Sequence, residues 1–226
     1  MSDANLNQIS TYLQTLTDPV QFTMRYAPAI ERYLHALLRD PHDAEEVLQD
    51  FLVRGLERGF VGTGPLRGRF RDYLKAAVRN AAVDRLRLRR PPEQGDFDLG
   101  ELPAHDADSS WLEEWRQCVL GRVWDALLAH QKRSPGNLFH TVLRLTVDHP
   151  DEDSAPLAER ASTEAGRPVA PAAFRKQLSR ARRQFAELLV AEVRRTLPNP
   201  SEERVAEELA DLGLLSYVRD LPAEPE

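Results

Sequence analysis

The stretch DAEEVLQDF, residues 43–51, decides how the first half of this chain is interpreted. Asp43 is a residue type that caps helices, and it follows Pro41, which disfavours continuation of the helix before it. The apolar positions then recur at helical spacing, while the acidic and amide side chains point elsewhere. These apolar positions are Ala44, Val47, Leu48, Phe51, Leu52 and Leu56. The stretch therefore predicts an amphipathic helix with a polar outer face.

Amphipathic helices are predicted on both sides of this stretch. Upstream, the apolar residues over 30–38 follow the same spacing. Downstream, residues 59–68 hold four glycines and a proline, which predicts a loop. A further helix is predicted over 70–90, where apolar positions form one stripe and arginines continue beyond it. The pair Pro91-Pro92 ends that helix.

The second half of the chain also shows helical spacing, and no segment alternates convincingly as a β-strand. Helices are expected over 111–127, 138–147, 156–165 and 171–195. A final acidic helix is expected after residue 200, with an apolar face of Val205, Leu209 and Leu212.

The fold class predicted from these patterns is all-α, with two small helical domains. The first domain is expected to cover residues 1–90, and the second, a helix-turn-helix domain, residues 111–197. Residues 91–110 are rich in proline, glycine and aspartate, which predicts an acidic linker between them. Residues 198–226 are expected to form an acidic helical tail.

The net charge of −6 hides a strong segregation of charge along the chain. Residues 67–90 hold nine basic and two acidic side chains, and residues 174–195 hold seven basic and two acidic ones. Residues 93–114 hold eight acids and no lysine or arginine, and residues 199–226 hold eight acids and two arginines. One basic run alone is commonly a solvated helix face. Two arginine-rich runs on predicted helices indicate contact with a polyanion.

Composition excludes several classes of protein. A hydrophobic content of 42% excludes wholesale disorder, and a single cysteine excludes an intramolecular disulfide framework. No run reaches the roughly 20 apolar residues of a membrane span, and the polar start MSDANLNQIS lacks a hydrophobic signal core, so we expect a cytoplasmic protein with no membrane contact. The six histidines show no close metal-ligand spacing. We therefore expect no metal, no cofactor and no catalytic residue.

The segment from Pro156 to Leu189 has the plan of a helix-turn-helix, in which the second helix enters the major groove. On that helix, Phe174, Leu178, Ala181 and Phe185 are expected to pack inward. The side chains expected to reach phosphates and base edges are Arg175, Lys176, Ser179, Arg182 and Arg183.

The other basic helix interleaves aromatic and cationic side chains. Phe70 and Tyr73 lie among the basic residues, and Asn80 follows. Aromatic rings with arginine and amide groups suit unpaired bases, which stack on the rings while cations follow the phosphates. Both aromatic residues also fit the apolar stripe, so a place in the core is the alternative.

These residues together resemble bacterial RNA polymerase sigma factors of the sigma-70 family, and most of all the extracytoplasmic-function group, which has two conserved domains. The resemblance rests on 25–28 (RYAP) and 37–51 (LLRDPHDAEEVLQDF), followed by 68–75 (GRFRDYLK) and 77–87 (AVRNAAVDRLR). A weaker likeness joins residues 175–189 to the helix of this family that reads the minus-thirty-five element. The combination of the strings, rather than any one of them, is specific.

The resemblance implies a promoter-specific initiation factor that makes no bond itself. Its partners would be core RNA polymerase, through the clamp helices and the flap, and promoter DNA, and an anti-sigma factor is left open. The implied polymerase-binding residues are Asp43, Glu45, Glu46, Gln49, Asp50 and Phe51. The implied minus-ten residues are Arg69, Phe70, Arg71, Lys75, Arg79, Asn80, Arg85 and Arg87. The implied minus-thirty-five residues are Arg175, Lys176, Ser179, Arg180, Arg182 and Arg183.

The second domain departs from the family pattern in several places. The string Pro135 to Phe139 stands where the family has a leading Leu-Pro-x-x-x-Arg. Arg167-Pro168 extends the turn, Ala170 replaces a capping hydroxyl residue, and Gln177 replaces a common arginine. A stand-alone helix-turn-helix regulator is therefore the alternative, and the acidic 43–51 helix, which such a regulator does not need, discriminates the two. An enzyme or a pure interaction module would need a polar pocket that the sequence does not offer.

Overall fold

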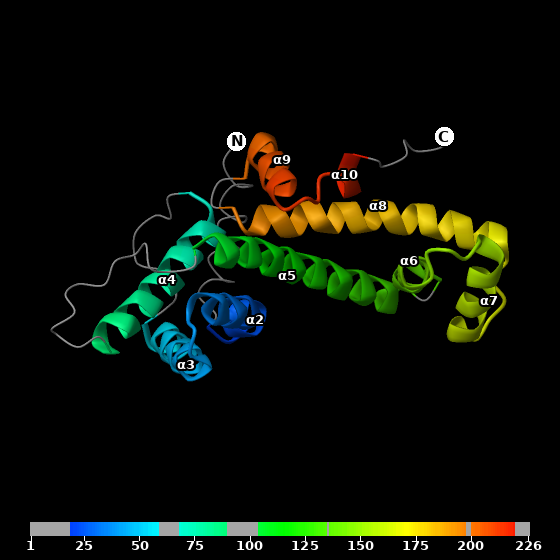
Figure 1. The fold of residues 1–226 in the computed structure, drawn as a ribbon. Coiled ribbons are helices and arrows are strands. Elements are labelled where there is room, and N and C mark those ends of the chain that lie inside the picture. The colour runs from blue at the N-terminus through cyan, green and yellow to red at the C-terminus, as the bar shows by residue number, and fades with distance from the viewer. Residues whose placement is uncertain (1–18, 59–67, 90–103, 135, 198–199, 220–226) are drawn as a thin grey trace. The chain divides into compact units, whose positions relative to one another are not determined.

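The computed structural model describes residues 19–58, 68–89, 104–134, 136–197 and 200–219, which consist of helices joined by short turns (Figure 1). The helices are α2 (Pro19–Leu37), α3 (Pro41–Arg58), α4 (Phe70–Arg89), α5 (Ala104–Arg133), α6 (Phe139–Asp148), α7 (Ser154–Ala165), α8 (Pro171–Arg195), α9 (Glu202–Asp211) and α10 (Ser216–Arg219). No strand occurs within these ranges, so the all-α prediction is confirmed. None of the described helices is long and apolar enough to cross a membrane.

Several expectations fall on other parts of the chain. The predicted glycine-rich loop lies outside the described residues except for Gly68, and so does the predicted linker up to residue 103. The N-terminal residues 1–18 and the final residues 220–226 of the predicted tail also lie outside them.

The chain divides into two compact units, and the division falls inside α5, α8 and α9. The first unit comprises residues Met1–Cys118 and Arg194–Val205, and the second comprises Val119–Val193 and Ala206–Glu226. In the first unit, α2 packs against α3 and α4, and α3 packs against α4. The shared core includes Ile30, Tyr33, Leu34, Val47, Leu74 and Val78, all of them buried.

An aromatic cluster closes the core of the first unit, and α5 supplies two of its rings, Trp111 and Trp115. Trp115 stacks on Tyr26, with ring centroids 4.9 Å apart, and lies 6.0 Å from the ring of Phe70. Trp111 lies 5.1 Å from the ring of Tyr33. The sequence analysis placed both tryptophans in the second domain and began their helix at residue 111. The structure begins α5 at Ala104 instead, because these large side chains complete the first core.

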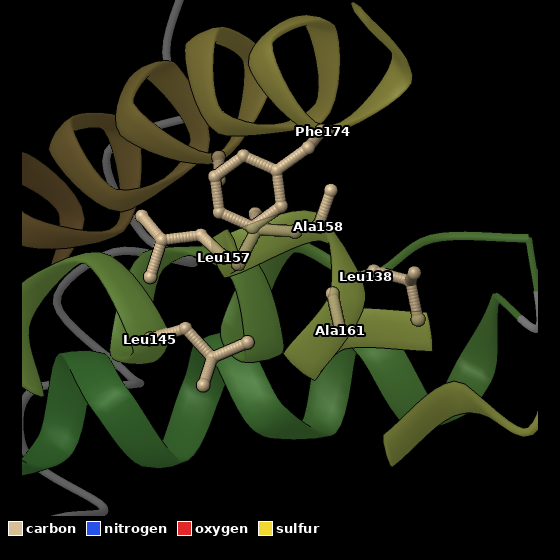
Figure 2. Close-up of a cluster of buried hydrophobic side chains, with 8 residues drawn as sticks. Leu138, Leu145, Leu157, Ala158, Ala161 and Phe174 are labelled. Atoms are coloured by element: carbon tan, nitrogen blue, oxygen red, sulfur yellow. The ribbon is translucent and has the colours of Figure 1, made fainter. Parts of the chain in front are cut away.

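The second unit has its own core, built mainly by the helix-turn-helix segment. The cluster is formed by Leu138, Val142, Leu145, Leu157, Ala158, Ala161, Phe174 and Ala181. Figure 2 shows Leu145 from α6, Leu157 from α7 and Phe174 from α8 gathered within it. Phe174 is 1% exposed, so the start of α8 is anchored by a fully buried ring.

The turn between α7 and α8 depends on one glycine. Gly166 ends α7 in the left-handed conformation, with φ 62°, and its N–H donates to Thr163 O at 3.4 Å. The hydroxyl of Ser162 then accepts a hydrogen bond from Val169 N at 2.9 Å. The extra residues Arg167 and Pro168 lie between these two contacts, so the longer turn is held by hydrogen bonds at both ends.

Replacing Gly166 by alanine is expected to lower the free energy of unfolding by about 1 kcal/mol, because a side chain disfavours the left-handed conformation. A Cβ atom at this position would meet no atom within 4 Å, so the cost comes from the backbone alone. Urea unfolding followed by circular dichroism measures it. Gly121→Ala, at an exposed helical position with no strained φ, is the matched control and should be neutral or stabilising.

Within the predicted acidic tail, residues 200–219 are described, and they pack against other parts of the chain. Glu202 of α9 forms an ion pair with Arg194 at the end of α8, within the first unit. In the second unit, Leu209, Leu212 and Leu214 are buried, and the ring of Tyr217 lies 6.2 Å from that of Phe185. The predicted apolar face of Val205, Leu209 and Leu212 is therefore confirmed as a buried face.

Candidate nucleic-acid interface

The outer face of α3 is polar at one end and apolar at the other. Glu45, Gln49 and Asp50 are exposed, as the sequence analysis expected of a docking surface. Val53 is 45% exposed and Leu56 is 47% exposed, so the same helix continues with two apolar side chains in solvent. The sequence analysis assigned Leu56 to the buried face. That prediction was wrong, because Leu56 points away from the buried face to which its neighbour Gly55 belongs; among the small or apolar residues of α3, only Ala44, Val47 and Gly55 are buried. Phe51 is half-buried.

Two acidic residues assigned to the same surface are instead engaged with α4. Asp43 is only 4% exposed, and its Oδ1 accepts a hydrogen bond of 2.9 Å from Arg85 Nε. Glu46 also forms an ion pair with Arg85. Both groups are therefore occupied within the first unit.

The start of α4 contributes to the core rather than to a stacking surface. Phe70 is 1% exposed, and its ring centroid lies 5.5 Å from that of Tyr26 and 6.0 Å from that of Trp115. Arg71 is also buried, with its Nε 3.5 Å from Asp72 Oδ1. The alternative weighed for Phe70, a place in the core, is the one found. Tyr73 is half-buried beside Phe70, with ring centroids 6.4 Å apart.

The remaining candidates on α4 differ in how available they are. Asn80 and Arg87 are exposed, and Arg69 is half-buried. Lys75 is paired with Asp108 of α5 through an Nζ–Oδ1 distance of 2.7 Å. Arg79 lies beside the hydroxyl of Tyr33, whose pKa is raised to about 12 by burial and by the nearby Asp108, with Arg79 acting in the opposite direction.

The basic face of α8 is open to solvent. Arg175, Lys176, Ser179, Arg180 and Arg182 are exposed and Arg183 is half-buried. Phe174, Ala181 and Phe185 are buried and Leu178 is half-buried, which is the inward face that the sequence predicted. One contact restrains this surface, since Arg175 Nη1 donates to Ser154 Oγ at 2.8 Å.

Residues that depart from the family pattern in the second domain are joined to one another by hydrogen bonds. Gln177 Nε2 donates to Gly136 O at 3.3 Å, and Arg167 Nη2 donates to the same carbonyl at 3.2 Å. Asn137 Oδ1 accepts from Phe139 N, at the first residue of α6, at 2.7 Å. Gln177 therefore holds the segment before α6 against α8, a role that sequence spacing alone could not reveal. An open hollow of about 350 Å³ lies here, bordered by Arg180 and Asn137.

The described residues offer little for catalysis. No group of three or more histidine, cysteine, aspartate or glutamate side chains within the described ranges could hold a metal ion. Burial raises the pKa of the Cys118 thiol to about 11, with the Glu114 carboxylate adding to the effect. A thiol with so high a pKa stays protonated at neutral pH and is a poor nucleophile.

An exposed basic helix after a tight turn is typical of helical nucleic-acid-binding proteins. Within that class the first unit is more specific. Residues 22–91 match the family model described as sigma-70 region 2, which covers α3, α4 and nearly all of α2. No curated protein and no solved structure matches the chain significantly. This segment is therefore similar to region 2 of the sigma-70 family, as the sequence resemblance implied.

The match supports a sigma-factor role in promoter recognition and melting with RNA polymerase.

Proposed function

We propose that this protein is a sigma factor that binds core RNA polymerase, directs it to particular promoters and opens the DNA there. The observation that carries the proposal is the region 2 match over a helix pair in which α3 exposes acidic side chains and α4 exposes an asparagine. The free energy for opening the DNA comes from binding alone, since the protein itself forms no covalent bond.

The polymerase-docking surface is proposed to consist of the exposed side chains of α3. Glu45, Gln49 and Asp50 supply polar contacts to the clamp helices, while Val53 and Leu56 supply the apolar contacts. Apolar anchors ringed by polar groups are typical of specific protein interfaces. Phe51 packs the helix from its half-buried side.

The minus-ten surface is proposed to centre on Asn80, at the middle of α4. Extruding a base from the stack costs a few kcal/mol, so a fixed acceptor and donor group must be in place to capture it. An asparagine amide supplies both. Arg69, Arg79 and Arg87 would follow the backbone of the separated strand, and Lys75 would join them if it left Asp108.

The minus-thirty-five surface is proposed to be the exposed face of α8, with the second unit also contacting the polymerase flap. Arg175, Lys176, Ser179, Arg180, Arg182 and Arg183 would contact phosphates and base edges in the major groove. The restraint of Arg175 by Ser154 indicates a positioning or phosphate role rather than a base-reading one. An anti-sigma partner would compete for either surface.

Two single substitutions on α8 are expected to separate affinity from specificity. Lys176→Gln should weaken binding to all duplex sequences alike. The slope of log K against log salt concentration should fall by about 1, as expected for the loss of one phosphate contact. Arg180→Ala, which removes a side chain proposed to read a base, should cost about 1–3 kcal/mol of binding free energy and relax the sequence preference at one position. Fluorescence anisotropy against a panel of minus-thirty-five duplexes at several salt concentrations measures both effects. Identical behaviour of the two variants would contradict these roles.

One experiment tests the proposed function itself. The tagged full-length protein is incubated with core polymerase and genomic DNA, the complex is captured, and run-off transcripts and bound DNA are sequenced. Discrete transcript starts that require the added protein would support the proposal. Specific duplex binding without any association with polymerase would instead identify a stand-alone helix-turn-helix regulator.

A further inference from the structure

Five charged side chains join the beginning of α3 to the end of α4, and we call them the clasp. The acidic members are Asp40, Asp43 and Glu46, and the basic members are Arg85 and Arg89. The Oδ1 atom of Asp43 accepts from Arg85 Nε at 2.9 Å, and its Oδ2 atom accepts from Arg89 Nη1 at 2.7 Å. Arg89 also donates to Asp40 Oδ2 at 3.2 Å, and Arg85 also pairs with Glu46.

The centre of the clasp is not available to another molecule. The side chain of Asp43 is 6% exposed, and each of its two oxygens is held by a different arginine. An external partner could reach this carboxylate only by breaking both charge-assisted hydrogen bonds, which are among the stronger ones in proteins. Arg85, with a side chain 27% exposed, is likewise turned toward α3 by two carboxylates.

The clasp lies at the C-terminal end of α4, where it can fix the position of the helix relative to α3. At 1.5 Å per residue, the 20 residues of α4 extend over roughly 30 Å. Phe70 anchors the first turn in the aromatic cluster, and the clasp anchors the last turns. Asn80 is exposed midway between these anchors. Because a helix is stiff, the two end anchors together fix where the amide of Asn80 stands relative to α3.

We propose that Asp43, Arg85 and Arg89 are positioning residues, which set the base-capturing face of α4 relative to the docking face of α3 and contact neither polymerase nor DNA themselves. This inference rests on the proposed function. It reassigns Asp43, expected from the family resemblance to contact polymerase, and Arg85, expected to contact DNA. Loss of the clasp would leave docking intact and misplace Asn80 for strand opening.

A double-mutant cycle in the full-length protein tests the proposal. The variants are Asp43→Asn, Arg85→Gln and the two combined. Asp50→Asn and Arg87→Gln are the comparison variants for direct contact, because they remove the same charges from exposed positions of the same helices, within the proposed docking and minus-ten surfaces and outside the clasp. Two steps are measured separately: affinity for core polymerase, and open-complex formation on promoter DNA at saturating polymerase.

The clasp predicts that the two single variants share one defect. Each should lower open-complex formation about tenfold, as expected for a misplaced reactive group, and keep polymerase affinity within about twofold of the parent protein. The double variant should be no worse than the poorer single variant, since one broken contact cannot be broken again. If Asp43 contacted polymerase and Arg85 contacted DNA directly, the two defects would instead be independent of each other. The proposal is overturned if the two defects multiply, or if Asp43→Asn weakens polymerase binding as much as Asp50→Asn does.

The same variants provide a readout that does not depend on polymerase. In urea unfolding, the clasp predicts strongly non-additive changes for Asp43→Asn and Arg85→Gln, and additive changes for the comparison pair. Additive changes at Asp43 and Arg85 would overturn the clasp even if the protein proved not to be a sigma factor. If a single variant is too unstable to assay with polymerase, Arg85→Lys, which keeps the charge but loses the Nε contact, replaces Arg85→Gln in both measurements.

Discussion

Replacing Glu45 and Asp50 together by lysine is expected to reduce affinity for core RNA polymerase about 100-fold or more, because like charges brought together at an interface cost several kcal/mol. Both side chains are exposed on α3, and neither belongs to the clasp with α4. Among the described residues, the contact found for Asp50 is a long one with Arg54, at 3.7 Å and one turn away on the same helix. The substitution should therefore change the surface without changing the fold. Surface plasmon resonance against immobilised core polymerase measures the loss.

The matched control replaces Glu31 and Glu159 by lysine. These residues are exposed on α2 and α7, so the control changes net charge equally and leaves α3 untouched. It should bind polymerase within about threefold of the parent, since a remote surface charge acts mainly through screened, long-range attraction. Duplex binding through α8 should survive in both proteins. Equal losses in the two proteins would show that bulk charge, and not the α3 surface, governs docking.

Replacing Trp115 by alanine is expected to lower the free energy of unfolding by about 3–5 kcal/mol, the usual cost of removing a buried aromatic ring. Trp115 is fully buried and stacks on Tyr26 while also contacting Phe70. The variant should therefore release the start of α4 as well as α5. Urea unfolding followed by circular dichroism and by the remaining tryptophan fluorescence measures the loss.

Trp115→Phe is the informative control for this prediction. Among the described residues none accepts a hydrogen bond from the buried Nε1 of Trp115, so phenylalanine loses volume and no hydrogen bond. Its cost should be about half that of alanine or less, because part of the ring stacking is kept. A stable Trp115→Ala protein would show that α5 merely lies against the first core without completing it.

The sequence predicted the helices well because each one carries its own signals. Periodic apolar residues, the prolines at 41 and 171 and the glycine at 166 locate α3, α8 and the end of α7 within a few residues. The inward face of α8 was also predictable, since Phe174, Ala181 and Phe185 repeat at helical spacing. These features depend on neighbours in the chain.

The role of each polar side chain was much less predictable. Glu45 and Asp43 are both acidic residues near the start of α3, yet one is exposed and the other is enclosed by two arginines more than 40 residues away. The surface role assigned to Phe70 and the buried role assigned to Leu56 failed in a similar way. Helical spacing identifies a stripe, but it does not say which of its residues the partner helices cover.

The sequence by itself therefore determined the all-α class, the family resemblance and the two basic helices, because local periodicity and short strings of residues carry that information. Only the tertiary structure decided that Trp111 and Trp115 complete the first core, that residues 200–219 pack into the protein, and that Asp43 and Arg85 hold α3 to α4. The physical reason is that burial and ion pairing depend on which distant side chains meet. That meeting is set by the packing of whole helices rather than by spacing within one of them.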